Sequence, residues 1–249
     1  MKISIITIAY NSAETIEGTI KSVVSQTHPD IEYIIIDGGS KDSTMDIVRS
    51  YESSIGIIVS EPDKGIYDAM NKGVNLATGD IIGILNSDDY YADENVIKDV
   101  HQRFVEDGSD GLYSDLVYVN REAPEKIVRY WKAGDYEPGL FKKGWMPPHP
   151  TFFVKRKCYE AFGTYSLELR SAADYELMLR FIHKHQISLS YLNRITAHMR
   201  LGGQSNVTLK NRIRANKEDR LAWKMNGLEP GKLTLLRKPL SKLTQFIRK

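Results

Sequence analysis

Cysteine is almost absent from this chain of 249 residues, because Cys158 is the only one. A single cysteine cannot form an internal disulfide framework, nor a zinc or iron–sulfur site that needs several thiolates. A chain this poor in cysteine fits a reducing, cytoplasmic setting. Disulfide-rich secreted proteins and cysteine-rich metalloproteins are therefore excluded as classes.

Long apolar runs and three common signature loops are absent as well. No stretch approaches the roughly 20 residues that a membrane-spanning helix requires. We expect residues 1–12 to form a first strand, because their apolar part is too short for a secretory signal. The sequence has no GxxxxGK(S/T) phosphate loop, no GxGxxG dinucleotide loop and no GxSxG hydrolase elbow. These absences argue against P-loop, dinucleotide-binding and α/β-hydrolase enzymes.

A strong net charge is missing too, since 34 Lys and Arg against 32 Asp and Glu leave +2. The distribution is uneven, however. Residues 204–249 hold 12 basic and 3 acidic side chains, a net of +9, which leaves residues 1–203 at −7. An acidic body with a basic tail indicates cation-assisted chemistry in the body and an anionic partner for the tail.

Short β-branched runs alternate with helical patterns in the first half of the chain. This alternation predicts a doubly wound parallel sheet, in which ligands bind beyond the carboxyl ends of the strands. Strands are expected at 3–8, 32–37, 55–59 and 81–85, with helices at 16–24, 45–48, 66–76 and 96–104. Farther on we expect strands at 111–120, 126–131, 151–154, 188–192 and 196–200, a loop at 145–150, and helices at 172–183, 207–226 and 233–247.

Polar clusters follow the first two strands. In residues 7–11 (TIAYN) a small residue beside an aromatic one lets a flat base lie against the strand end, although a strand end with a helix cap gives the same pattern. In residues 37–44 (DGGSKDST) Asp37 is placed to accept a hydrogen bond from a ribose or a base. The alternative is a turn followed by a helix cap at Asp42 or Ser43.

Two more clusters follow the third and fourth strands. In residues 61–73 (EPDKGIYDAMNKG) Asp68, Asn71 and Lys72 share a helix face, which either grips a sugar nucleotide or is simply solvated. In residues 86–89 (NSDD) two adjacent carboxylates follow an apolar strand. Burying them is costly unless a cation compensates, so a divalent ion bridging to a diphosphate is indicated, with an acidic turn as the alternative.

The four clusters in this order resemble the family 2 glycosyltransferases, and the closest subgroup makes bacterial O-antigen and colanic-acid polysaccharides. The match continues through residues 148–153 (PHPTFF), 173–177 (ADYEL) and 202–205 (GGQS). The resemblance implies an α/β GT-A fold with a Rossmann-like, mostly parallel central sheet flanked by helices and a C-terminal helical tail. The catalytic domain would span 1–205, with a nucleotide-binding half at about 1–105 and an acceptor half at about 106–205, and the basic tail would span 206–249.

The resemblance also implies roles for individual residues. Asp88 matches the principal ligand of a divalent cation, Mn²⁺ or Mg²⁺, and His198 is a further candidate metal ligand. The donor-binding residues implied are Thr7, Ala9, Tyr10, Asn11, Asp37, Gly65, Asp68, Asn71, Asn86, Ser87, Asp89, His149 and Arg200. For His149 packing within its loop is the alternative, and Arg200 is expected to pair with phosphate.

The sequence departs from the family pattern at three positions. Gly38 stands where the second Asp of D-D-G-S often contacts the base, Asn86 replaces the first Asp of D-x-D, and Ala173 replaces the Glu of the usual Glu-Asp. The Gly38 departure bears on the choice of nucleotide. The Asn86 departure bears on the strength of metal binding.

Asp174 matches the catalytic base of the family, and it stands at a predicted helix start beside an apolar stripe. An acidic residue favoured there by the helix dipole is the alternative. The implied reaction is an inverting transfer of a sugar from a nucleotide-sugar donor, with UDP-sugar favoured, to a lipid-linked saccharide or glycan. Asp174 would accept the proton of the acceptor hydroxyl, while a cation at Asp88 would neutralise the diphosphate.

The basic tail admits three partners. A basic amphipathic segment suits an anionic membrane surface, which would place the enzyme on the inner face of the plasma membrane, but packing on the core or in a homodimer remains open.

Two other functions of the protein compete with glycosyl transfer. A sugar nucleotidyltransferase needs a Gly-rich, basic loop that residues 11–14 lack. A nucleic-acid binder would leave Asp88 and Asp174 without purpose, so we expect no nucleic-acid partner.

Overall fold

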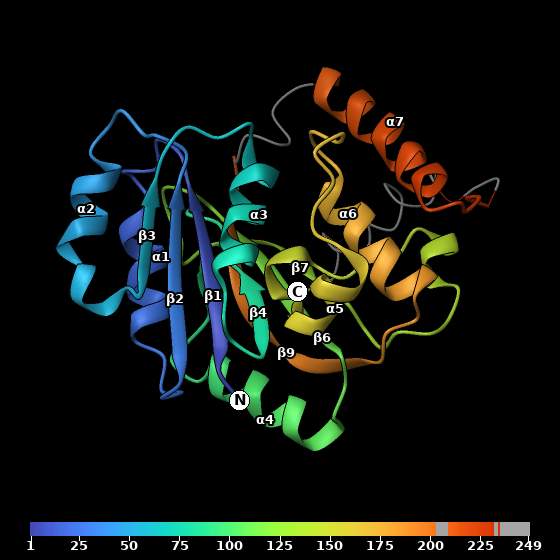
Figure 1. The fold of residues 1–249 in the computed structure, drawn as a ribbon, viewed down its shortest axis with the longest axis horizontal. Coiled ribbons are helices and arrows are strands. Elements are labelled where there is room, and N and C mark those ends of the chain that lie inside the picture. The colour runs from blue at the N-terminus through green and yellow to red at the C-terminus, as the bar shows by residue number, and fades with distance from the viewer. Residues whose placement is uncertain (203–208, 232–233, 235–249) are drawn as a thin grey trace.

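The structure is a computed structural model that describes residues 1–202, 209–231 and 234 (Figure 1). Its N-terminal half is built on four parallel strands: β1 (Ile3–Ala9), β2 (Ile31–Asp37), β3 (Ile57–Ser60) and β4 (Ile81–Ile84), in the order β3-β2-β1-β4. β1 and β4 are buried throughout, as continuous apolar runs in a sheet covered on both faces should be.

Helices cover both faces of these strands. The helices are α1 (Ile16–Val24), α2 (Thr44–Ser50), α3 (Ile66–Leu76) and α4 (Val96–Asp107), with a short 3₁₀ turn at Glu52–Ser54. Because side chains alternate along a strand, Ile6 and Ile8 pack toward α3 while Ile3 and Ile5 pack toward α1 and α4. The two faces therefore form two separate apolar cores.

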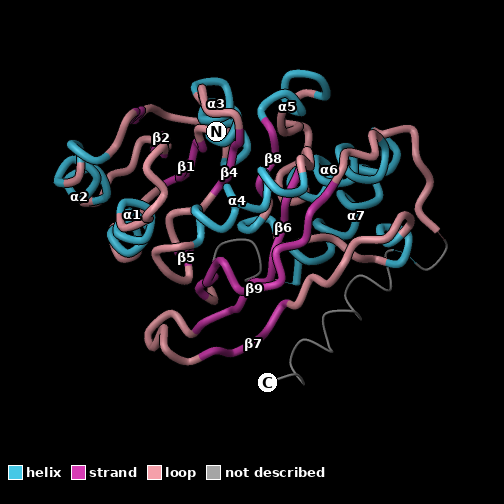
Figure 2. The backbone as a smooth tube through the Cα atoms, turned by 90° about the horizontal axis from the view of Figure 1, so that it is seen from below, coloured by secondary structure: helices cyan, strands magenta, loops and turns pink. Residues whose placement is uncertain are grey.

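The C-terminal half adds the longer strands β6 (Gly111–Val119) and β9 (Leu189–Arg200), which pair in parallel. Antiparallel strands complete the sheet: β8 (Phe153–Lys155) joins β4 to β6, β7 (Ile127–Trp131) pairs with β6, and β5 (Asp89–Tyr91) pairs with β9. Figure 2 shows β7 at the margin of the molecule, away from β1, β2 and β4. The α/β fold class predicted from the sequence is confirmed.

Several elements of this half differ from the sequence-based prediction. Residues 188–192 and 196–200 belong to one strand, β9, whose pairing with β6 shifts register at Asp115. β5 and α5 (Arg156–Phe162) were not predicted. The predicted helix at 172–183 is α6 (Ala173–Met178), which continues as a π-helix over Leu179–Lys184, and short 3₁₀ turns lie at Leu140–Lys143 and His149–Thr151.

The first tail helix packs on the body of the molecule. α7 (Leu209–Met225), expected at 207–226, lies beside α6 in Figure 1. The side chain of Trp223 is completely buried and its Nε1 donates to Tyr175 Oη at 2.8 Å. Asn226 Nδ2 donates to Glu176 Oε1 at 2.9 Å. Of the partners left open for the tail, this helix therefore takes the core.

The second tail helix, expected at 233–247, lies outside the described residues, so the membrane surface and the homodimer stay predictions. Within residues 1–202, 209–231 and 234, no helix combines the length and the apolar character needed to cross a bilayer.

Candidate active site

The polar clusters at the ends of β1, β2 and β4 meet at one edge of the sheet, as parallel neighbours require. Ser12 Oγ lies 2.7 Å from Ser87 Oγ, which joins the first cluster to the fourth. The backbone N–H of Asn11 donates to Ser40 Oγ at 2.8 Å, and Asn11 Oδ1 accepts from the N–H of Lys41 at 2.8 Å, which joins the first cluster to the second. The three clusters thus form one surface.

Residues at the end of β1 contribute unequally to that surface. The Thr7 side chain is buried and bonds to Tyr33 Oη at 3.1 Å. Ala9 is also buried, and its carbonyl accepts the N–H of Gly38 at 2.9 Å. Tyr10, by contrast, is 53% exposed. The aromatic ring of Tyr10 is therefore what this strand end offers to a ligand, while Thr7 and Ala9 shape the backbone behind it.

The side chain of Asp37 stabilises the turn that follows β2. Its carboxylate is fully buried and accepts from the N–H of Gly39 at 3.1 Å, the N–H of Ser40 at 3.0 Å, Ser60 Oγ at 2.7 Å and also Ser40 Oγ. Three of these hydrogen bonds end at Oδ2 and the one from Ser40 Oγ ends at Oδ1. Together they hold the turn after β2. The contact of Asp37 with a ribose or base stays a prediction.

The polar residues of α3 likewise connect protein segments. Asp68 Oδ2 accepts the N–H of Lys64 at 3.0 Å, in the loop whose Gly65 precedes the helix with a φ of 118°. The Asn71 amide exchanges two hydrogen bonds with the backbone of Tyr165, at 2.9 and 2.8 Å. Both side chains tie α3 to neighbouring loops, so the face that was predicted to grip a sugar nucleotide is largely occupied by structural contacts.

A buried carboxylate stands at the start of β5, in the segment that follows β4. Asp89 is completely buried and neither of its oxygens has a hydrogen-bond partner among the described residues. Burial, and secondarily the charge of Asp88, raises the pKa of Asp89 well above its usual range. Arg200 lies close by, where its Nη1 donates to the Asp88 carbonyl at 2.8 Å and its guanidinium sits 4.6 Å over the Tyr90 ring. An orphaned carboxylate of this kind fits a bound cation.

His198 lies away from that carboxylate pair. Its ring meets Tyr90 edge-on at 4.9 Å, opposite it in the β5–β9 pairing, and the nearby charges that affect its pKa are those of Arg200 and Asp93. In the described part of the chain no three His, Cys, Asp or Glu side chains gather as a metal cluster. Asp88 and Asp89 are the neighbouring carboxylates that fit a cation, and the metal contact expected of His198 stays a prediction.

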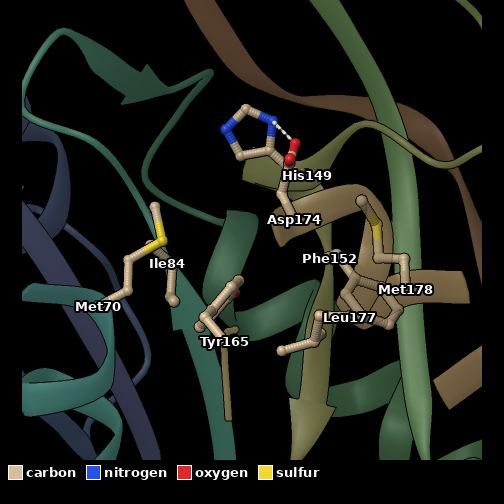
Figure 3. A pocket seen from close by; sticks show the side chains of 8 residues that line it. All are labelled: Met70, Ile84, His149, Phe152, Tyr165, Asp174, Leu177 and Met178. Carbon is tan, nitrogen blue, oxygen red and sulfur yellow. Dashed lines mark ion pairs between the residues drawn. The ribbon is translucent and has the colours of Figure 1, made fainter. Parts of the chain in front are cut away.

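Asp174 stands at the first turn of α6 and faces two side chains from distant segments (Figure 3). Tyr67 Oη, from α3, donates to Asp174 Oδ1 at 3.2 Å. His149 Nδ1 lies 3.7 Å from Asp174 Oδ2. The Asp174 side chain keeps 23% of its surface exposed, so one side of the carboxylate is open.

His149 links Asp174 to the end of β4. Its Nε2 lies 3.3 Å from Asn86 Nδ2. With Nδ2 as the donor of this contact, Nε2 accepts, and a neutral ring in this tautomer carries its proton on Nδ1, which faces Asp174. Thr151, whose Oγ1 donates to the Ser114 carbonyl at 3.0 Å, fastens this turn to β6. His149 thus contacts both Asp174 and Asn86, whereas the role expected of His198 stays a prediction.

Comparison with known proteins decides the family. The sequence model described as Glycosyl transferase family 2 matches residues 4–174, well over half of the chain. The chain belongs to this family. It is 31% identical over 208 residues to the PGL/p-HBAD biosynthesis glycosyltransferase of Mycobacterium bovis (strain BCG / Pasteur 1173P2), which covers 82% of this chain and 78% of the relative.

Two further comparisons extend this result. The glycosyltransferase is 39% identical over 100 residues, 40% of each chain, to the Escherichia coli UDP-Glc:alpha-D-GlcNAc-diphosphoundecaprenol beta-1,3-glucosyltransferase WfaP. Its fold matches S. aureus TarS 1-349, solved with UDP-GlcNAc, with a TM-score of 0.69 at 18% identity, over 91% of this chain and 65% of the TarS chain. The likeness to TarS establishes a shared fold.

A small cavity of this glycosyltransferase lies beside Asp174. Figure 3 shows the carboxylate and His149 above side chains that come from α3, β4, α6 and the loops between them. Apart from those two groups and the Tyr165 hydroxyl, the lining is apolar: Met70, Ile84, Phe152, Leu177 and Met178. Asp174 therefore sits between an apolar pocket and the polar edge of the sheet.

The sequence did not predict the contributions of Tyr67, Tyr165 and Glu218 to the site. Tyr67 holds Asp174, and its ring stacks on Tyr165 with a centroid distance of 5.9 Å. Glu218 of α7 accepts the N–H groups of Arg170 at 3.1 Å and Ser171 at 2.7 Å, in the segment that leads to Asp174. Tyr67 lies in the conspicuous 61–73 motif, whereas nothing in the sequence near Glu218 points to residues 170–171.

Proposed function

We propose that this glycosyltransferase moves a sugar from a UDP-sugar donor to a lipid-linked saccharide, with inversion at the anomeric carbon, in bacterial surface polysaccharide or glycolipid synthesis. The observation that carries the proposal is the Asp174 carboxylate, held by Tyr67 and His149 beside a pocket and linked through His149 to Asn86. The UDP-GlcNAc complex of TarS and the lipid-diphosphate acceptor in the name of WfaP support the choice of donor and acceptor classes.

In the proposed mechanism Asp174 Oδ2 accepts the proton of the acceptor hydroxyl as that oxygen attacks the anomeric carbon. Tyr67 donates to Oδ1 and fixes the carboxylate plane, while the Nδ1–H of His149 approaches Oδ2 from one side. The displacement is direct, so no covalent link to the enzyme forms. Arg200, next to Asp88, supplies positive charge for the departing diphosphate. A divalent cation held by Asp88 and Asp89 would neutralise further charge on that group.

A screen of nucleotide sugars by thermal unfolding tests the donor. A UDP-sugar at about 100 times its Kd stabilises a protein by about 2.7 kcal/mol, which is roughly 5–10 °C for a chain of this size. We expect this shift for a UDP-sugar with Mn²⁺ and a smaller one with EDTA. Asp88→Asn should reduce the difference that Mn²⁺ makes, whereas Asp46→Asn, an exposed carboxylate on α2, should not. Stabilisation by a nucleoside triphosphate with a sugar phosphate, but by no nucleotide sugar, would favour a nucleotidyltransferase instead.

Acidification should inactivate the enzyme through His149. Burial lowers the pKa of His149 below its usual 6.5, although the nearby carboxylates of Asp174 and Asp88 oppose the shift. The folded state thus prefers the neutral ring, so the stability from this group is complete above pH 6.5 and is lost as the pH falls through the folded pKa. The imidazolium would then pair with Asp174 and hinder its approach to the acceptor proton.

We therefore expect kcat to decline below pH 6.5, and His149→Gln to remove that step from the profile even if it lowers the maximum. Measuring kcat between about pH 5 and 8 checks this. An acid limb that is identical in the two proteins would show that another group controls it.

A further inference from the structure

The loop of residues 61–65 closes over the turn after β2. The N–H of Glu61 donates to the Asp37 carbonyl at 3.0 Å, continuing the pairing of β2 with β3. Lys72 of α3 anchors the loop through an ion pair with Glu61 at 2.7 Å and a hydrogen bond to the Pro62 carbonyl at 3.2 Å. The side chain that follows, Asp63, is thereby held in place over the turn.

The carboxylate of Asp63 occupies the space that a side chain at position 38 would fill. A Cβ built on Gly38 would lie 2.3 Å from Asp63 Oδ2 and 3.1 Å from Asp63 Cγ. The same point is 3.4 Å from Cδ2 of Tyr10. A side chain at position 38 would therefore have to displace the Asp63 carboxylate, which places an acidic group from the neighbouring loop where Gly38 leaves room for it.

One oxygen of this carboxylate is open. Asp63 Oδ1 accepts the N–H of Gly65 at 2.7 Å, while Oδ2 has no hydrogen-bond or ion-pair partner among the described residues. Asp37 differs from Asp63, because its carboxylate accepts hydrogen bonds from four donors and each of its oxygens has at least one. At the edge formed by β1, β2 and the 61–65 loop, Asp63 is thus the carboxylate with a free acceptor beside the exposed ring of Tyr10.

We propose that Asp63 determines nucleotide specificity by accepting a hydrogen bond from the base of the donor while that base packs on Tyr10. This proposal rests on the proposed function, because it concerns the same donor. A carboxylate only accepts hydrogen bonds, so it suits the N3–H of uracil and opposes the unprotonated N3 of cytosine. An aromatic face beside it stacks on any base and leaves discrimination to the carboxylate.

Calorimetric titration with UDP and CDP, in the presence of Mn²⁺, tests the proposal. In Asp63→Asn the amide oxygen can still accept from Gly65, while the NH₂ group now points to the base as a donor. We expect UDP binding to weaken by roughly 10- to 100-fold and the ratio of UDP to CDP affinity to fall with it. Lys64→Ala, an exposed neighbour in the same loop, should leave that ratio unchanged.

Moving the carboxylate back provides a second test. Gly38→Asp alone should impair UDP binding, because its side chain would meet Asp63. Gly38→Asp combined with Asp63→Ala removes that conflict and should bind UDP within a few-fold of the wild type. A folded double variant that binds UDP no better than Asp63→Ala, or an Asp63→Asn protein with the wild-type UDP/CDP ratio, would overturn the proposal and leave the proposed function intact. A wild-type protein that binds neither nucleotide would overturn both.

Discussion

Asp174→Asn is expected to lower kcat by about 10²- to 10⁴-fold, the usual contribution of a general base. The amide keeps the size of the side chain and can still accept from Tyr67, but it cannot take the proton of an acceptor hydroxyl. The KM for the donor should change little, because Asp174 faces the acceptor side of the proposed reaction. Initial rates with saturating donor and varied acceptor measure the effect.

The matched control for Asp174→Asn is Asp46→Asn. Asp46 also stands in the first turn of a helix, α2, but it is exposed and remote from the proposed site. If acidic residues at these positions serve only the helix dipole, the two variants will lose similar, small amounts of stability and neither will lose activity. Near-normal turnover by a folded Asp174→Asn protein would remove Asp174 from the mechanism.

Trp223→Ala is expected to destabilise the protein by about 3–5 kcal/mol, the range for removing a large aromatic side chain from a core. Trp223 is completely buried, packs edge-on against His183 at a centroid distance of 5.3 Å, and bonds to Tyr175. The truncation leaves a cavity between α7 and α6 that a small side chain cannot fill. For a chain of this length the corresponding fall in Tm is roughly 6–20 °C.

Urea denaturation of three proteins measures this effect. Trp223→Phe keeps much of the ring volume and should lose less stability than Trp223→Ala, while Leu221→Ala, at a position 37% exposed on the same helix, should lose little. Equal denaturation midpoints for Trp223→Ala and the wild type would mean that α7 does not dock on α6 in solution.

The parallel half of the fold was predictable because its signals are local. Strands buried on both faces are continuous β-branched runs such as residues 34–36, and each is followed by a helical period, so the residues themselves mark the elements. The second half was harder. The three-residue strand β5 exists because β9 is there to pair with it, and the continuity of β9 across residues 193–195 depends on its register with β6.

The candidate site shows the same division. The positions of Asp88, Asp89 and Asp174 at element ends follow from the pattern of the sequence, and the structure puts them there. What each polar group contacts depends on residues far away in the chain. Tertiary contacts set the four donors to Asp37, the hydrogen bonds of Asn71 with the backbone of Tyr165, and the contact of His149 with Asn86. The spacing of residues within a motif does not predict such contacts.

The docking of α7 has a consequence for how the enzyme is made. The groups that cover the helix carrying Asp174 and brace the segment before it, Glu218, Trp223 and Asn226, lie 47 to 50 residues farther along the chain than their partners, so they leave the ribosome after them. The parallel strands β1 to β4 can assemble before α7 has been synthesised. The proposed catalytic base gains this support only after α7 has been made, so we expect a chain that ends before α7 to be inactive even if its sheet has formed.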